Sequence, residues 1–264
     1  MENIPPNLAS SGAIEIAEKL KLISGGKILD VATGDGDTIQ FLINFLKDYE
    51  FVIGIDIDEE QLEKAQEEFN DNPITVQKMN AERLDFLDES FDLVYLANSM
   101  HHMQYLNKTL SEMKRVLKKG GYFLIQEMFC DDNQTDAQKY DTETHEFGAE
   151  IDRMLGTYHR QEFTRDEILD IISQLKLKDL EIFESSRYPK CLKCPEMYDC
   201  EDPKNPDNVT TTLDEIDKIL ERIKDYKEYD EFKEKAETLK QNIKKHGRAG
   251  TSILFYIGKK DDKI

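Results

Sequence analysis

The chain has 264 residues, of which 39% are hydrophobic and 34% charged, a size that suits one compact domain with an elaboration or two small domains. Its formal net charge of -20 excludes tight binding to nucleic-acid phosphate or to an anionic bilayer unless a basic patch offsets the repulsion, and the sequence has no such patch. No stretch approaches the about 20 consecutive apolar residues of a membrane span. We expect a soluble protein with neither a nucleic-acid nor a membrane partner.

The first residues, MENIPPNLASSG, lack the basic and apolar regions of a secretion signal. We therefore expect a cytoplasmic protein. In that compartment its four cysteines are expected to be free thiols or metal ligands rather than disulfides.

Short apolar runs alternate with segments of helical periodicity along most of the chain. After a first helix at residues 9–23, strands are predicted at 27–32, 51–57, 74–79, 91–97, 122–129, 180–183 and 252–257, and helices at 38–46, 59–69, 105–117 and 164–175. The apolar runs are too continuous for a sheet with one wet face, so both faces are expected to be covered by helices. The pattern predicts an α/β fold: a Rossmann-like, doubly wound, mostly parallel seven-stranded sheet with helical insertions.

Two segments interrupt this alternation. Residues 130–163 are too long for an ordinary connection, which predicts a lid segment. Residues 185–250 contain three cysteines and, from 213 to 243, apolar positions three or four residues apart. This spacing predicts a helix hairpin with a break near 226–230. We favour a hairpin that helps to roof the site over one that forms a dimer interface. We thus expect a core of residues 1–184 and 251–264 and a cysteine-containing helical insertion at 185–250. The protein is either a monomer or a homodimer.

The most informative motif is the segment DVATGDG, residues 30–36, between the first sheet strand and the next helix. Doubly wound sheets bind ligands at the carboxyl ends of their strands, and glycines let a ligand approach the backbone. A dinucleotide-binding loop has a third glycine where Ile39 stands, and its phosphates would be repelled by Asp35 and Asp37. The loop therefore favours a cationic ligand and disfavours a nicotinamide dehydrogenase.

In these residues the chain resembles the class I S-adenosylmethionine-dependent methyltransferases, whose first motif is an acid, three residues and G-x-G. Further matches are an acid at the end of the second strand and the segment NAE after the third. The resemblance implies that S-adenosyl-L-methionine is the cofactor, that Asp56 accepts from the ribose hydroxyls, and that Asn80, where the family has Asp, faces the adenine. The cofactor-binding residues implied are Asp30, Ala32, Gly34, Gly36, Asp56, Ile57, Asn80, Ala81, Glu82 and Asn98.

The segment NSMHH, residues 98–102, follows the fourth strand. It lacks the Pro-Pro-Tyr signature of enzymes that methylate bases or amides, and it is similar to that of the small-molecule methyltransferases, where such segments end in histidine. By this resemblance His101 is the candidate catalytic residue, as a proton acceptor or as a group that orients the acceptor. His102 is expected to be a packed, hydrogen-bonded side chain.

The lid segment contains several polar residues on an expected amphipathic helix: His145, Glu146, Glu150, Asp152, Arg153, Tyr158 and His159. We expect most of them to form a solvated face, with Arg153 as a candidate contact for an anionic acceptor. Histidines at the H-x-x-x-H spacing of a metal site are absent from this helix.

Three cysteines, Cys191, Cys194 and Cys200, lie close together in the insertion. They are candidate metal ligands or redox-active thiols. Structural zinc would need a fourth ligand, from Cys130, a histidine or a second chain, and an iron–sulfur cluster is an alternative.

The sequence predicts an S-adenosylmethionine-dependent methyltransferase that acts on a small-molecule acceptor by in-line methyl transfer. The alternative is a non-catalytic sensor or scaffold that binds the same cofactor and uses the cysteine segment and the helical insertion for interactions.

Overall fold

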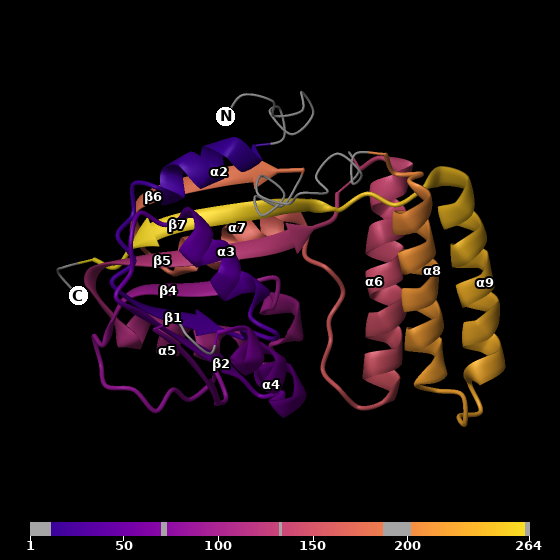
Figure 1. Ribbon diagram of the computed structural model, residues 1–264, viewed down its shortest axis with the longest axis horizontal. Coiled ribbons are helices and arrows are strands. Elements are labelled where there is room, and N and C mark those ends of the chain that lie inside the picture. The colour runs from indigo at the N-terminus through magenta and orange to yellow at the C-terminus, as the bar shows by residue number, and fades with distance from the viewer. Residues whose placement is uncertain (1–11, 70–72, 132–133, 187–201, 262–264) are drawn as a thin grey trace.

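The computed structural model describes residues 12–69, 73–131, 134–186 and 202–261. It contains a seven-stranded sheet in the order β3-β2-β1-β4-β5-β7-β6 (Figure 1). The strands are β1 (Lys27–Val31), β2 (Phe51–Asp56), β3 (Ile74–Lys78), β4 (Phe91–Ala97), β5 (Leu117–Phe129), β6 (Lys178–Ser185) and β7 (Ser252–Lys259). Only β7 runs antiparallel to its neighbours, β5 and β6. The predicted doubly wound, mostly parallel sheet is confirmed.

Helices cover both faces of the sheet, as the continuous apolar strands require. One face packs against α2 (Ala13–Leu20), α3 (Asp37–Phe45) and Phe69 at the end of α4 (Glu59–Glu68). The other face packs against α5 (Leu106–Val116) and α7 (Arg165–Gln174). Thr164 caps α7 in a capping box with Glu167, as its spacing predicted.

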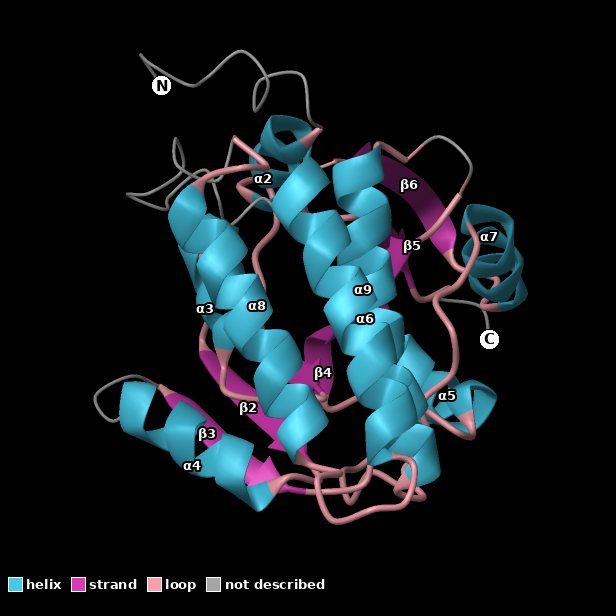
Figure 2. Cartoon of the chain, turned by 90° about the vertical axis from the view of Figure 1, so that its right-hand side faces the viewer, coloured by secondary structure: helices cyan, strands magenta, loops and turns pink. Residues whose placement is uncertain are grey.

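A third group of helices stands beyond the carboxyl ends of the parallel strands (Figure 1). This helical layer consists of α6 (Asp136–Met154), α8 (Pro206–Glu221) and α9 (Tyr229–His246), which lie side by side in Figure 2. The expected helix hairpin is present as α8 and α9, with its turn at residues 222–228. The helix of the lid segment, α6, shares an apolar core with this hairpin, in which Phe147 and Ile151 meet Ile216 and Ile243.

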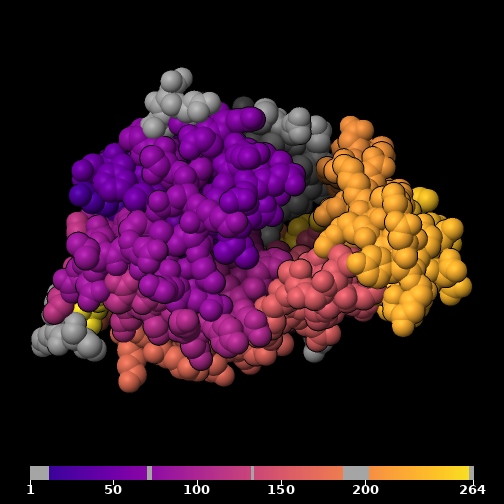
Figure 3. All heavy atoms as spheres, turned by 90° about the horizontal axis from the view of Figure 1, so that it is seen from below, coloured from indigo at the N-terminus to yellow at the C-terminus, as the bar shows by residue number. Residues whose placement is uncertain are grey.

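A partly buried arginine joins the helical layer to the sheet. The Arg248 side chain, next to β7, lies 2.5 Å from Asp141 on α6 and 2.9 Å from Glu215 on α8. Asp141 also accepts from the backbone N–H of Thr251. These contacts fix the start of α6 relative to β7, and Figure 3 shows the helical layer beside the core with a recess between them. None of the described helices has the length and apolar composition needed to cross a bilayer.

The shared core of the helical layer predicts a clear cost for truncating one of its leucines. Leu239 on α9 is 6% exposed, whereas Leu87, in a loop of the core domain, is 83% exposed. Leu239→Ala should lower the free energy of unfolding by about 2–5 kcal/mol, and Leu87→Ala by less than about 0.5 kcal/mol. Urea unfolding followed by circular dichroism measures both, and equal losses would show that the helical layer has no packed core.

Candidate functional site

The loop after β1 is shaped by residues with left-handed backbone. Ala32, Gly34 and Gly36 have φ of 56°, 52° and 96°. A Cβ on Gly36 would lie 2.5 Å from the Phe69 ring, so only glycine fits there, whereas a Cβ on Gly34 would meet no atom within 4 Å. The space in front of Gly34 is therefore open to a ligand. Ala32 holds a strained conformation that non-glycine residues keep mainly at functional sites.

Asp30 lies fully buried beneath this loop. Its Oδ2 accepts from the hydroxyls of Thr33, at 2.5 Å, and Thr38, at 2.6 Å, while its Oδ1 has no hydrogen-bond partner. Burial raises the pKa of Asp30 to about 7, against the lowering effect of the two hydroxyls, and the charge of Asp56 raises it further. A cationic ligand near Oδ1 would supply the positive charge needed to stabilise the ionised carboxylate of Asp30.

Asp56, at the end of β2, is held against the same loop. Its Oδ2 accepts from the Gly34 N–H at 2.9 Å, and its Oδ1 accepts from the N–H groups of Ile57 and Asp58 at 2.7 and 3.0 Å. Each oxygen retains room for a further donor, because a carboxylate offers about four lone-pair positions. Beside it Ile57 is 66% exposed, an apolar surface available to a ligand.

The segment after β3 lies next to Asp56. Met79 donates its N–H to the Asp56 carbonyl at 2.8 Å, and Asn80 Oδ1 accepts from the Glu82 N–H at 2.8 Å. Ala81 packs on the core from the edge of the segment.

Two residues of α5 anchor the loop that follows. Arg115 donates to the carbonyls of Leu84 and Phe86, and Glu112 accepts from the Leu84 N–H. The hydrogen bond from Arg115 holds the pKa of Glu112 down to about 2.

Asn98 completes the group of predicted cofactor residues. It follows β4, whose Leu96 pairs with Val31 of β1, so it lies beside the glycine loop. Its φ is 46° and its buried Oδ1 has no hydrogen-bond partner. The structure therefore brings the predicted residues of β1, β2, β3 and β4 to one edge of the sheet.

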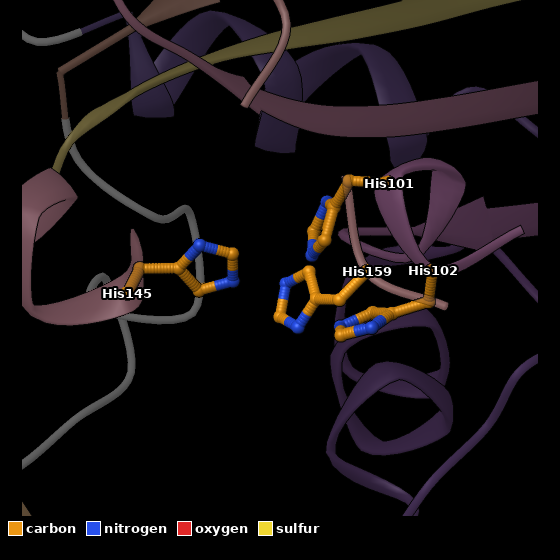
Figure 4. Close-up of side chains that lie close together, drawn as sticks. All are labelled: His101, His102, His145 and His159. Carbon is orange, nitrogen blue, oxygen red and sulfur yellow. The ribbon is translucent and has the colours of Figure 1, made fainter. Parts of the chain in front are cut away.

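Four histidines converge beside this edge (Figure 4). His101 and His102 form a 3-10 turn (Met100–His102) after β4, His145 lies on α6, and His159 lies between α6 and α7. One ring nitrogen from each lies within 4.8 Å of those of the other three. The rings of His102 and His159 are 4.1 Å apart between centroids, and those of His101 and His145 are 4.9 Å apart.

Carboxylates lie behind three of these rings. Nδ1 of His101 is 2.9 Å from Glu127, and Nδ1 of His159 is 2.7 Å from Asp152. Nδ1 of His145 lies 2.9 Å from Glu162, but in a geometry too bent for a linear hydrogen bond. Figure 4 shows the rings directed toward one another.

The charges around the cluster act differently on its members. The pKa of His102 is lowered to about 3, first by loss of hydration of the ring and then by the other three histidines. The residue as a whole nevertheless remains exposed to solvent. Burial also lowers the pKa of His159. Burial would lower the pKa of His145 as well, but Glu162, Glu127 and Asp141 raise it above its ordinary value.

The environments of the two adjacent histidines are the reverse of those expected from the sequence. His101, the candidate catalytic residue, is the packed one, 1% exposed and bonded to Glu127, whereas His102 is exposed. Consecutive residues of a tight turn point in different directions, and the carboxylate from β5 selects His101.

The lid residues are not a uniformly solvated face. His159 is only 5% exposed, and Arg153 is paired with Glu146 and with the His159 carbonyl.

The sequence did not predict that His145 and His159 lie next to the histidines of the turn after β4, because no local spacing encodes this proximity. The candidate metal ligands Cys191, Cys194 and Cys200 lie outside the described residues.

Comparisons with known proteins agree with this arrangement. Residues 29–125 match the family described as "Methyltransferase domain". A ubiquinone/menaquinone biosynthesis C-methyltransferase UbiE of Bartonella bacilliformis is 36% identical over 109 residues, which cover 40% of this chain and 42% of that protein. A demethylmenaquinone methyltransferase of Bacteroides fragilis is 36% identical over 117 residues, covering 43% and 47%. The chain thus spans less than half the length of both relatives.

Among solved structures, the phosphoethanolamine N-methyltransferase 2 of Haemonchus contortus, in complex with S-adenosyl-L-methionine, superposes with a TM-score of 0.54 at 18% identity, covering 97% of this chain and 55% of that one. At this identity the likeness concerns the fold. The family match over residues 29–125, the two relatives and the motif order at the sheet edge show that the chain contains a class I S-adenosylmethionine-dependent methyltransferase domain.

Proposed function

We propose that the protein transfers the methyl group of S-adenosyl-L-methionine to a small-molecule acceptor bound beside the turn after β4. The observation that carries the proposal is the fully buried Asp30, whose Oδ1 lacks a partner beneath an open glycine loop. This arrangement suits a cationic ligand and disfavours a diphosphate.

The residues at the sheet edge fit this cofactor. Asp30 would compensate its positive charge, and Asp56, already oriented by three backbone N–H groups, would accept from the ribose hydroxyls. Ile57 and the segment from Asn80 to Glu82 would face the adenine, and Asn98 Oδ1 would accept from the cofactor. When bound, the cofactor supplies a methyl group on a sulfonium, which is electrophilic.

A pocket of about 460 Å³ lies between the turn after β4, the start of α5 and α7, and it is the candidate acceptor site. Met100, Met103, Tyr105, Phe163 and Ile171 give it a mostly apolar lining. Such a wall positions the acceptor and excludes water, which supplies much of the rate of a displacement reaction. His101 positions the turn that bounds this pocket through its contact with Glu127.

The acceptor itself is a separate question from the cofactor. Two relatives are named for quinone methylation, but the matches to them cover less than half of this chain, and the family match ends at residue 125. Tyr158, Arg160 and Phe163, which line the pocket, lie beyond it. We therefore propose a small acceptor with apolar character without assigning it to quinones.

Methyl transfer can be tested directly. Purified protein incubated with cofactor carrying a labelled methyl group and a low-molecular-mass metabolite extract should transfer label to an organic-extractable product. A protein that binds the cofactor yet labels nothing would contradict the enzymatic proposal and favour the sensor or scaffold alternative.

Asp56→Ala should weaken cofactor binding about ten- to a hundredfold, because charge-assisted hydrogen bonds contribute about 1.5–3 kcal/mol. Isothermal titration calorimetry measures the affinity. Asp170→Ala, which removes an exposed carboxylate on α7, is the matched control and should bind like the unchanged protein. Equal affinity of both variants would refute the assignment of Asp56.

Cofactor binding should release protons near neutral pH. The pKa of Asp30 is raised to about 7 in the free protein, and a bound cation would lower it, so affinity should rise as pH increases from about 5.5 to 7.5. Titrations at pH 7 in buffers of different ionisation enthalpy should show release of about half a proton per ligand.

Asp30→Asn should remove this proton release, and Asp35→Asn, at the exposed tip of the same loop, should retain it. The comparison also separates the contribution of Asp30 from that of the cofactor's own amino group. Proton release that persists in Asp30→Asn would show that another group is responsible.

A further inference from the structure

We propose that His101, His102, His145 and His159 together bind one divalent transition-metal ion of the zinc class. The four residues are other than the candidate cysteine ligands, and the proposal does not depend on the proposed methyl transfer. It joins two residues that follow β4 with two residues contributed by the lid segment, 130–163.

The donor set is that of a metal site. Imidazole nitrogen is a ligand for zinc, iron, nickel and copper, and hard ions such as magnesium and calcium prefer oxygen. Four ring nitrogens lie within 4.8 Å of one another. Tetrahedral zinc, with bonds of about 2.0–2.1 Å, brings such atoms to about 3.4 Å apart, so side-chain shifts of about an ångström complete the site.

The carboxylates around the cluster match the outer shell of histidine metal sites. Metal-binding histidines donate their second ring N–H to a carboxylate or carbonyl, which fixes the nitrogen that faces the ion. Glu127 and Asp152 stand in this position at 2.9 and 2.7 Å from His101 and His159, and Glu162 lies 2.9 Å from His145. Asp152 is also paired with Arg222 at 2.6 Å, so the negative charge that favours a cation between the rings comes from Glu127 and Glu162.

Without an ion the facing nitrogens have no favourable arrangement. Since Nδ1 of His159 contacts Asp152, its Nε2 faces the cluster, and this buried atom has no hydrogen-bond partner. In the three histidines whose Nδ1 faces a carboxylate, neutral rings turn Nε2 lone pairs toward one another, and protonated rings turn positive charges toward one another. An ion that accepts the lone pairs removes this conflict and the cost of a buried unpaired polar atom.

The surroundings indicate that the ion would be reachable from outside. His102 is exposed, so the site opens to solvent on its side. Met100, Tyr158 and Arg160, adjacent in sequence to the ligands, line the pocket proposed for the acceptor. His145 and Glu162 line a second pocket of about 340 Å³ beneath α8.

Zinc binding to the full-length chain tests the proposal. Protein treated with chelator and then dialysed should bind one equivalent of zinc at the histidines and show a higher melting temperature. His101→Ala and His159→Ala should each lose at least tenfold in affinity. The chain has five histidines, so His246→Ala, on α9 and 3.2 Å from Asp136, is the matched control and should bind zinc normally.

Two milder variants keep the test valid if the alanine variants fail to fold. His145→Gln changes a residue whose side chain is 25% exposed, and it should weaken binding similarly. Glu162→Gln leaves all four ligands in place, and loss of the outer carboxylate should reduce affinity about 10- to 100-fold. Melting curves by circular dichroism confirm folding.

Substituting Cys191, Cys194 and Cys200 together by serine separates the two candidate metal sites. Cobalt bound in place of zinc should show visible bands without the near-ultraviolet charge transfer of a thiolate ligand, and the serine variant should retain them. The proposal is overturned if the folded, unchanged protein binds no zinc, or if zinc is lost in the serine variant and kept in the folded histidine variants.

Discussion

The parallel pairing of β1 with β2 and β4 is the constraint on which the candidate site depends. Val31 pairs with Ile55 on one side and with Leu96 on the other, so the three strands end at nearly the same level. Parallel strands need crossover helices over the faces of the sheet, which leaves the carboxyl edge free for ligands. The glycine loop, Asp56 and Asn98 are therefore neighbours although they are distant in sequence, and the helical layer stands beyond the same edge (Figure 1).

Two fully buried carboxylates near this edge meet the cost of burial in different ways. Glu127 interacts with the Met100 N–H and with His101 Nδ1, so both of its oxygens have partners. Asp30 receives two hydroxyls on one oxygen and none on the other. The pKa of a buried carboxylate rises when one of its oxygens has no hydrogen-bond partner, because burial then favours the neutral form. Glu127 thus fixes the turn after β4, whereas Asp30 retains capacity for a ligand.

The sequence predicted what local patterns encode. Apolar periodicity located all seven strands, and the motif after β1 lies within seven consecutive residues, so both could be recognised from short segments. The histidine cluster could not, because its four residues come from a turn, a helix and a loop brought together by the packing of α6 against the sheet edge. The H-x-x-x-H motif describes two histidines on one helix, so it cannot indicate a cluster whose histidines come from three separate segments. Likewise, the choice between His101 and His102 depends on Glu127, which lies on another strand.

The boundary of the family match divides the site into two parts. Residues 29–125 contain the proposed cofactor groups and the proposed ligands His101 and His102, but they end before Glu127, His145 and His159. Two imidazoles do not make a tetrahedral site, so the matched region alone cannot hold the ion, and neither can the lid segment. A metal at this position requires α6 and the loop after it to stand against the carboxyl edge of the sheet. The segments beyond residue 125 would then both shape the acceptor pocket and complete the metal site, which would tie the proposed chemistry to the docking of the lid segment on the sheet edge.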